Sequence, residues 1–314
     1  MVLSRRFNFD LYRLNVVDFE DLFLEDADQS RIRLDDELKQ VLDAACDSKR
    51  DQTQETRTAE FLWSARELYC YPLIHGRALC SLILARSTIS KDGLIVTEEG
   101  LSAGKSAATP PLASAATVFF DLSRHLVAVE HTGELSQTAW KDFFERIVSE
   151  TALSLGFTSS FELEPVPEKY GIIGLFKSFD KLTRMKVTLR IPNPELTRYT
   201  KSLYDDLAKS GVREYTQDMK SPNGLSKSED ARPYASAYLA EQGYKKGDVQ
   251  FTGIRDDGEE TVRSGSVSAR GSIKQVRDFV RGMHTTAKTK EAQAALSAII
   301  NEIDKLHPKG EMDE

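Results

Sequence analysis

The feature that most constrains the fold is a run of alternating apolar and polar residues from Asp248 to Val267. Alternation with a period of two is typical of a β-strand with one buried face. The turn residues Asp256, Asp257 and Gly258 divide the run into two strands, which predicts a β-hairpin. The text that follows predicts a helix from Ile273 to Met283 with basic residues at its polar positions.

Similar alternation recurs along the chain and is interspersed with helical patterns. Strands are expected at 7–16, 58–71, 77–86, 118–133 (a hairpin), 161–166, 185–191 and 212–215. Helices are expected at 34–45, 136–151, 169–182, 195–209, 234–242 and 292–306. Because most consecutive strands look hairpin-connected, the pattern predicts an α+β fold with mainly antiparallel sheets and interspersed amphipathic helices.

Charge divides the chain into two expected modules. Residues 1–164 carry 17 Lys+Arg and 27 Asp+Glu, whereas the remainder carries 25 and 22. We therefore expect an acidic α+β module at 1–164, a C-terminal α+β module with a basic helix at 165–306, and a polar tail at 307–314. The low-complexity text of residues 100–116, with Pro110 and Pro111, is interpreted as a flexible loop or linker.

Composition is that of an ordinary globular protein. No run of eighteen apolar residues occurs, and the first residues alternate where a signal peptide would need a continuous apolar stretch, so we expect a cytoplasmic chain without membrane insertion. The spacing of Cys46, Cys70 and Cys80 matches neither a zinc site nor a disulfide framework. These cysteines are interpreted as small buried hydrophobic residues.

No catalytic or metal-binding motif stands out. The segment GLSAGKS at 100–106 is one residue short of a phosphate-binding P-loop and leads to prolines in place of a helix. The five histidines have no metal-ligand spacing, a GxSxG elbow is absent, and the SxxK match at Ser178–Lys181 lacks companion motifs. No catalytic residue, metal or cofactor is therefore assigned.

A basic cluster is the remaining positive signal. Between Thr261 and Lys290 there are seven cations and one acid, Asp278. Three of them recur at helical spacing on one face of the expected helix, an arrangement suited to sequence-independent phosphate contacts. A solvated helix face is the alternative interpretation. The candidate nucleic-acid-binding residues are Arg263, Arg270, Lys274, Arg277, Arg281, Lys288 and Lys290. A second basic run could join them: Lys177, Lys181, Arg184, Lys186 and Arg190.

Four segments carry a family resemblance. They are the opening FNFDLYRLNVVD, the hairpin FFDLSRHLVAVEHT, the strand ending in IPNP, and GYKKGDVQFTGIRDDGEETVRSGSV followed by the expected helix. With these segments the chain resembles bacterial and prophage proteins related to the RexA exclusion protein of phage lambda. The resemblance implies a homodimeric, non-enzymatic DNA-binding protein that senses phage replication or recombination and signals to a partner. The acidic overall balance and the segment 100–116 depart from that family.

Three functional hypotheses follow. The first is a cytoplasmic, homo-oligomeric protein of anti-phage defence or phage exclusion that binds double-stranded DNA through the basic cluster and acts with a protein partner. The second is a protein-interaction or assembly module, with the apolar stripe Leu296, Ile299, Ile300 and Ile303 as its contact or the acidic half as a nucleic-acid mimic. The third is a metal-dependent nuclease whose acidic residues assemble only in the fold.

Overall fold

A computed structural model gives the structure of the chain. It describes residues 6–18, 35–98, 100–107, 109–132, 139–168, 171–190, 214–255, 258–264, 268–274 and 290–308, together with positions 135, 203, 205–207, 209, 210 and 212.

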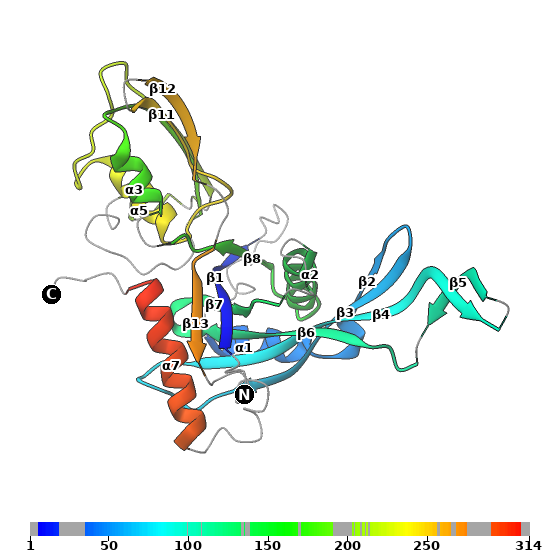
Figure 1. Cartoon of the computed structure of the whole chain (residues 1–314). Helices are drawn as coiled ribbons and strands as arrows, with labels where there is room; N and C mark the ends of the chain where they lie inside the picture. The colour runs from blue at the N-terminus through cyan, green and yellow to red at the C-terminus, as the bar shows by residue number, and fades with distance from the viewer. Residues whose placement is uncertain are drawn as a thin grey trace.

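A large antiparallel sheet forms the centre of the molecule (Figure 1). Its strand order is β13-β1-β7-β6-β4-β3-β2, with β5 paired to β4 and β8 paired to β1. The strands are β1 (Arg6–Asp18), β2 (Gln52–Glu55), β3 (Ala59–Cys70), β4 (Leu79–Thr97), β5 (Gly100–Ala107), β6 (Ala113–Asp121), β7 (Leu126–Glu130), β8 (Ser159–Pro165) and β13 (Arg270–Lys274).

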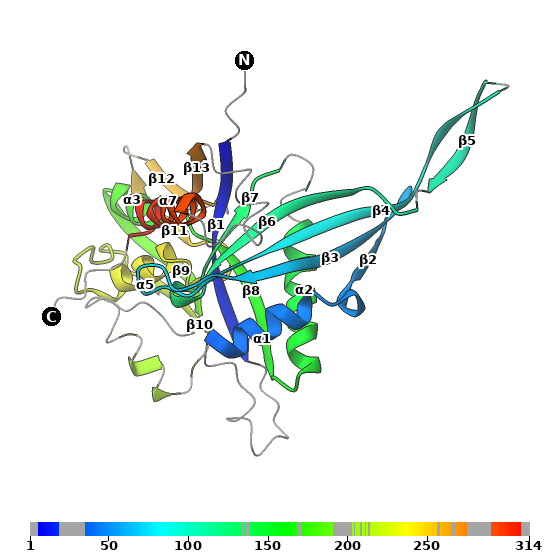
Figure 2. The ribbon, with the colours of Figure 1, turned by 90° about the horizontal axis from the view of Figure 1, so that it is seen from below.

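The two faces of this sheet are covered by different helices, as the two-residue period of β1 requires. Phe7, Phe9 and Leu11 share a core with α7 (Lys290–Leu306). Tyr12 and Leu14 pack with α1 (Asp35–Ala45) and α2 (Ala139–Ser154). Figure 2 shows α7 apart from the α1 and α2 pair.

The apolar stripe of α7 belongs to the core. Leu296, Ile299, Ile300 and Ile303 are between 0% and 2% exposed and lie in the cluster that contains the β1 phenylalanines. The stripe therefore stabilises the fold, and its interpretation as a contact with a partner is wrong.

A second, smaller sheet has the strand order β10-β9-β11-β12 and is also antiparallel. Its strands are β9 (Lys181–Arg190), β10 (Glu214–Lys220), β11 (Gln250–Arg255) and β12 (Gly258–Arg263). Helices α3 (Gly171–Ser178) and α5 (Arg232–Glu241) share a core with the side chains of one face, including Met185, Val187 and Phe251. The opposite face of this sheet carries polar residues.

The expected α+β class with mainly antiparallel sheets is confirmed. The hairpin expected at 248–267 is present as β11 and β12, with the turn residues 256 and 257 outside the described residues. The helix expected at 195–209 lies mostly outside them as well. Among the helices that the structure describes, none combines the length and hydrophobicity of a membrane span.

Two expected elements are wrong. The segment 100–116 is largely strand and not a loop: β5 pairs with β4 over its whole length, and β6 begins at Ala113. The helix expected from Ile273 does not begin there, because Ile273 is in β13 and pairs with Phe7 of β1. Gly271 suits this pairing, since a Cβ atom at that position would lie 2.2 Å from the Phe9 ring. Residues 275–289 are outside the described part of the chain.

The chain crosses between the two sheets more than once. It leaves the large sheet after β8, close to the boundary expected at residue 164, and builds the small sheet from residues 181–263. It then returns, because β13 pairs with β1 and α7 packs on the same core. His307, the first residue of the expected polar tail, is itself buried.

Candidate nucleic-acid interface

The structure separates the cations that the sequence grouped together. Arg263 ends β12 in the small sheet, whereas Arg270 begins β13 in the large sheet. Lys274 ends β13 and Lys290 begins α7, but their side chains are outside the described part. Arg277, Arg281 and Lys288 also lie outside it. Arg263 and Arg270 therefore do not belong to one basic patch, because they lie in different sheets.

Arg270 is engaged on the large sheet. Its Nε donates to the buried carboxylate of Asp10 at 3.0 Å, and His131 Nδ1 lies 2.9 Å from the other oxygen of Asp10. Asp10 and Arg270 face each other in the pairing of β1 with β13. The Asp10 carboxylate therefore balances the positive charge of Arg270 at the point where β1 pairs with β13.

The small sheet brings Arg263 together with cations that are far away in sequence. In the register of its four strands, Asp218 of β10 faces Lys186 of β9, Lys186 faces Gln250 of β11, and Gln250 faces Arg263 of β12. Residues opposite one another in a sheet project from the same face. Lys186 and Arg263 therefore lie on one face, two strand positions apart.

The adjacent row also holds two cations, but it has two threonines and no acid. Lys220 faces Arg184, Arg184 faces Thr252, and Thr252 faces Thr261. The neighbouring positions Met185, Val187 and Phe251 are buried on the helix-covered side. We call the side that no described helix covers the open face. Its residues are Arg184, Lys186, Thr188, Thr216, Asp218, Lys220, Gln250, Thr252, Thr261 and Arg263.

Cations outnumber acids on the open face. Arg184 forms a bidentate pair with Asp218, at 2.7 Å from Nε and 2.8 Å from Nη2, and Lys220 Nζ lies 3.2 Å from the same carboxylate. The hydrogen bonds from Arg184 are the main cause that lowers the pKa of Asp218 to about 2. Asp218 is thus ionised at neutral pH and offsets one positive charge. Lys186 is exposed beside Asp218, and Arg263 is exposed in the same row, three strands away from it.

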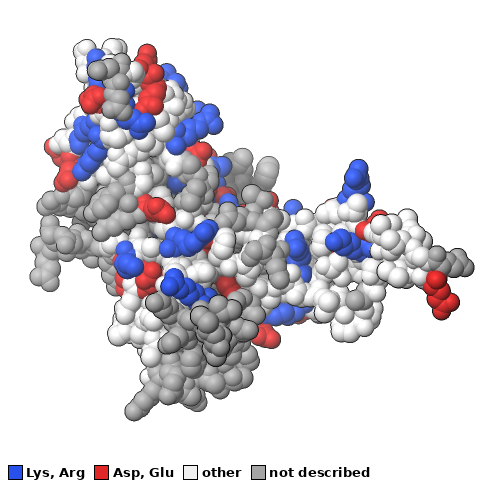
Figure 3. Space-filling view, in the orientation of Figure 1, with Lys and Arg blue, Asp and Glu red and all other residues white. Residues whose placement is uncertain are grey.

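Acidic residues mark the two ends of the open face. Glu214 pairs with Arg190 in register at one end and lies 3.0 Å from Lys246. Glu259, opposite Ile254, is exposed at the other end. In the orientation of Figure 3, Lys and Arg are interspersed with Asp and Glu over the molecule. The positive charge of the open face is therefore local.

A hollow of about 240 Å³ lies between the cations of the first row. Its lining includes Lys186, Thr188, Gln250 and Arg263, with Val187 and Asp248 completing it. An ammonium, a guanidinium, an amide and a hydroxyl group around a small depression are the donors that commonly bind a phosphate group. The hollow is thus a candidate phosphate site at one end of the open face, with the carboxylate of Asp248 as the one acidic group in its lining.

The open face is fixed relative to the large sheet. Arg190, at the end of β9, is buried and forms an ion pair with Glu162 of β8. Lys245 Nζ lies 3.8 Å from the carboxylate of Glu164, also on β8. Burial is the main cause that lowers the pKa of Lys245 and raises the pKa of Glu164. These contacts lock one end of the small sheet against the large one.

The comparisons with known proteins give a family but no activity. A family model described as a domain of unknown function (DUF4747) matches residues 107–276, more than half of the chain. The chain belongs to the DUF4747 family. No curated protein matches it. The DUF4747 match contains the whole small sheet, and with it the open face, whereas α1, β2 to β4 and α7 lie outside the matched residues.

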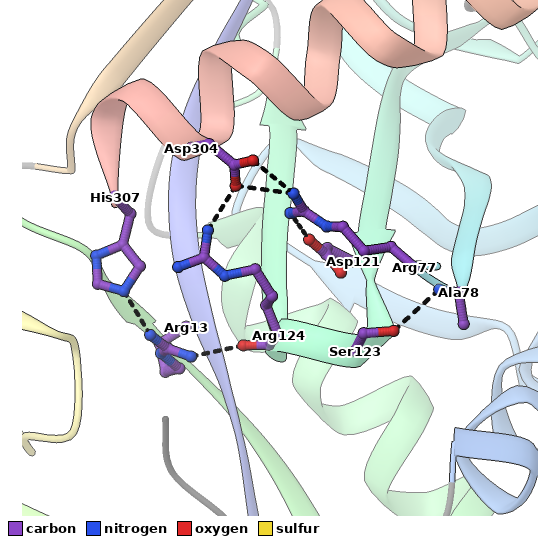
Figure 4. Close-up of polar contacts among 8 residues, drawn as sticks. All are labelled: Arg13, Arg77, Ala78, Asp121, Ser123, Arg124, Asp304 and His307. Atoms are coloured by element: carbon purple, nitrogen blue, oxygen red, sulfur yellow. Dashed lines mark hydrogen bonds and ion pairs between the residues drawn. The ribbon is translucent and has the colours of Figure 1, made fainter. Parts of the chain in front are cut away.

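A second group of cations in this DUF4747 protein is buried and structural (Figure 4). Arg77 and Arg124, from the chain before β4 and from the short helix η2 (Leu122–Arg124), both reach Asp304 of α7, at 2.8 and 2.6 Å. Arg77 also pairs with the buried Asp121. The network joins α7 to the sheet, and its guanidinium groups are engaged within the protein.

Arg13 extends this network toward the small sheet. Its Nη1 donates to the Arg124 carbonyl at 2.6 Å and its Nε donates to the Gln242 carbonyl at 2.9 Å. Its Nη2 lies 2.7 Å from His307 Nε2, and its guanidinium lies over the Tyr244 ring. Arg13 therefore connects β1, η2, the end of α7 and the segment after α5 at one buried point.

Other sequence candidates find different places. The GLSAGKS segment forms β5, so it has no strand-to-helix turn to hold a phosphate. Cys70 and Cys80 face each other across β3 and β4 with their Sγ atoms 2.7 Å apart, a pairing that sequence spacing did not indicate. Within the described ranges, no three His, Cys, Asp or Glu side chains are grouped as metal ligands.

Sequence reasoning found part of the open face. Arg184 and Lys186 belong to the second basic run, but that run divides in the structure. Arg190 is buried at the junction, and Lys177 of α3 lies over the Tyr234 ring on the helix-covered side. Lys220 was missed, although the alternation of exposed Thr216, Asp218 and Lys220 in β10 carries the signal.

Proposed function

We propose that this DUF4747 protein binds double-stranded DNA through phosphate contacts made by the open face. The observation that carries the proposal is the register that places Lys186 and Arg263 around one hollow, with Arg184 and Lys220 in the next row. The chain as a whole carries a net charge of −7, so binding depends on this local surface.

The chemistry of the open face favours backbone contacts over base recognition. None of its defining residues is aromatic, whereas proteins that hold single strands usually stack bases on aromatic side chains. Its donors are ammonium, guanidinium, hydroxyl and amide groups, which position a nucleic acid by its phosphates. A duplex, with its phosphates displayed on the outside, is therefore the preferred ligand.

The spacing of the cations suits successive phosphates. Neighbouring strands lie about 4.8 Å apart, so Lys186 and Arg263 stem from positions roughly 10 Å apart. Arg184 and Lys186 are two residues apart on β9, a step of about 6.7 Å. Because both side chains are long and flexible, they reach several phosphates of one duplex without a fixed sequence.

The test is a salt series with a labelled duplex, followed by fluorescence anisotropy. Asp218 offsets one of the four cations, so about three phosphate contacts remain. They predict a slope of about −2.7 in log affinity against log salt, or a loss of about 40-fold between about 50 and 200 mM salt. The double variant Lys186→Gln with Arg263→Gln should reduce the slope to about −0.9 and the loss to about 3.5-fold.

The matched control removes two exposed cations elsewhere, Lys49→Gln with Lys305→Gln, so the net charge is the same in both variants. The control should bind like the unmodified chain. Equal slopes for the two double variants, or no binding at low salt, would contradict the proposal. Loss of binding only in Arg277→Glu with Arg281→Glu would place the site on the basic segment predicted from the sequence.

The biological role follows the RexA resemblance and is proposed with the DNA binding. We expect a phage-exclusion function, with a protein partner, in which the DNA-binding step detects phage replication or recombination. Plaque counts on cells that express the chain should fall, and the Lys186→Gln with Arg263→Gln variant should restore them. Magnesium-dependent cleavage of the duplex in the binding assay would support the nuclease hypothesis.

A further inference from the structure

A two-stranded ribbon extends from the large sheet into solvent (Figures 1 and 2). It consists of the end of β4, from Ser90 to Thr97, and all of β5, which pairs only with β4 among the described strands. The last residue of β4 that pairs with β3 is Lys91. We call this ribbon the arm. An isolated two-stranded ribbon is only marginally stable in water, so a partner is expected for it.

One side of the arm covers itself. Ile95 lies over Gly104, where a Cβ atom would stand 2.5 Å from its Cδ1 atom. Gly93 faces Gly104 in register, and Ser102 faces Ile95. The isoleucine thus covers backbone that glycine leaves bare, and it is the least exposed of the large apolar residues of the arm, at 37%.

The other side of the arm is apolar and uncovered. Val96 faces Leu101 in register, and Leu94 projects from the same side because it is two residues from Val96. Leu94, Val96 and Leu101 are 71%, 84% and 68% exposed. Three neighbouring large apolar side chains on one ribbon face are typical of an interaction surface.

Charge along the arm is polarised. Glu98 is exposed at the tip, and Glu99 follows it in sequence. Lys91 and Lys105 are exposed where the arm leaves the body, with Lys105 opposite Asp92. Figure 3 shows an acidic side chain toward the far end of the arm, and basic side chains with an acidic one among them nearer the body. The acidic tip makes nucleic acid a poor ligand for the arm.

We infer that the arm binds the arm of a second copy of this chain, with the two ribbons antiparallel about a two-fold axis. The two-fold axis reverses direction, so the acidic tip of one arm meets the base of the other, where Lys105 lies on the apolar side and Lys91 on the side of Ile95. Seven residues separate Lys91 from Glu98, a span of roughly 23 Å that is the same in both copies. Leu94 lies near the middle of that span, so Leu94, Val96 and Leu101 of the two copies pack together around the two-fold axis.

The contact is small, which sets its expected strength. A ribbon face two strands wide and about 23 Å long is below the size of a standard interface, so a dimer with a dissociation constant of about 1 to 100 μM is expected. The inference does not depend on DNA binding, because the arm lies almost entirely outside the DUF4747 match, which begins at residue 107.

Sedimentation velocity over a range of concentrations tests the apolar part. The unmodified chain should dimerise, and the variant Leu94→Ser with Val96→Ser should remain monomeric at about 100 μM. The matched control, Leu73→Ser with Leu112→Ser, changes two exposed leucines outside the arm and should dimerise like the unmodified chain. Circular dichroism should be the same for all, since the substituted side chains are exposed.

A charge exchange tests the direction of the arms. One variant carries Lys91→Glu with Lys105→Glu, so that every charged residue of the arm is acidic. The other variant carries Glu98→Lys with Glu99→Lys. Each should fail to dimerise alone, because like charges then meet at both ends of the interface. A mixture of the two should form a heterodimer, because every tip then meets a base of opposite charge.

Three outcomes would overturn the inference. The first is an unmodified chain that stays monomeric at every concentration. The second is a dimer that persists in the arm variants. The third is a mixture of the two charge variants that forms no heterodimer. Arm-dependent flotation of the chain with phosphatidylcholine and phosphatidylglycerol vesicles would instead assign the apolar face to a lipid surface.

Discussion

The buried His307 should make the protein sensitive to mild acid. Burial, together with the nearby guanidinium groups of Arg13 and Arg124, lowers the pKa of His307 well below its ordinary value of 6.5. Arg13 Nη2 lies 2.7 Å from His307 Nε2, and Asp304, one turn earlier on α7, is occupied by Arg77 and Arg124. The imidazole is therefore neutral in the folded state and accepts a hydrogen bond from Arg13.

The magnitude follows from proton linkage. Below about pH 6.5 the unfolded chain binds a proton at this histidine and the folded chain does not, so the free energy of unfolding falls as pH falls. The limiting slope is about 1.4 kcal/mol per pH unit, and the loss between about pH 6.5 and 5.5 is about 1 kcal/mol. Above pH 6.5 the effect disappears, because both states are then neutral.

The buried carboxyl group of Glu145 changes the stability in the opposite direction with pH. Burial is the main cause that raises the pKa of Glu145 from 4.5 to about 7. The folded state holds that proton between these pH values, so this carboxyl group makes the protein less stable as pH rises. The total pH profile therefore mixes both effects, and the contribution of His307 is measured as a difference between variants.

The assay is urea unfolding of the unmodified chain and of His307→Gln at about pH 7.5, 6.5 and 5.5. Glutamine retains an acceptor for Arg13 and does not titrate, so the difference in unfolding free energy should move in favour of the variant by about 1 kcal/mol as pH falls from 6.5 to 5.5. His75→Gln, at an exposed histidine, is the control and should show no such movement. A difference that stays constant over this pH range would refute the reasoning.

Two further predictions concern the core of α7 and the paired cysteines. Ile299→Ala should cost about 2 to 5 kcal/mol in urea unfolding at any protein concentration, whereas the exposed Asn301→Ala should change stability by less than about 0.5 kcal/mol; a loss seen only in dilute samples would point to a partner contact. Oxidised glutathione should form a disulfide between Cys70 and Cys80, because a hydrogen bond from Cys80 lowers the pKa of Cys70 to about 7. Mass spectrometry should show that the chain has lost two hydrogens, and two molecules of reduced glutathione should be released for each disulfide. Cys46, whose pKa burial raises to about 11, should stay reduced, and a Cys46 adduct without the Cys70 link would contradict this.

Strand alternation predicted most of the large sheet, but composition misled at one place. Residues 100–107 are rich in glycine, alanine and serine, which favours a loop, yet they form β5. The reason is that Ser90–Thr97 supplies a partner for the whole segment, and small residues suit the side that Ile95 covers. Backbone pairing of this kind depends on a neighbour and leaves little trace in local composition.

The candidate site was harder to predict than the fold. Lys186, Gln250 and Arg263 meet only because β9, β11 and β12 adopt one register, which shifts at an irregularity between Thr252 and Gly253. Gly253 is required there, since a Cβ atom would lie 2.2 Å from the Lys181 carbonyl oxygen. A change of one residue in this register would move the cations to the opposite face. The sequence contains the cations but does not reveal which of them meet.

The open face and the arm together make a prediction that neither makes alone. If two copies join through their arms, one assembly carries two open faces, and a duplex long enough to span both should bind more tightly than a short one. The gain should be on the order of 10²-fold and should vanish in Leu94→Ser with Val96→Ser, while the affinity for a short duplex stays the same. Anisotropy with duplexes of two lengths measures this directly. An equal loss on both lengths would mean that the arm contacts the nucleic acid itself.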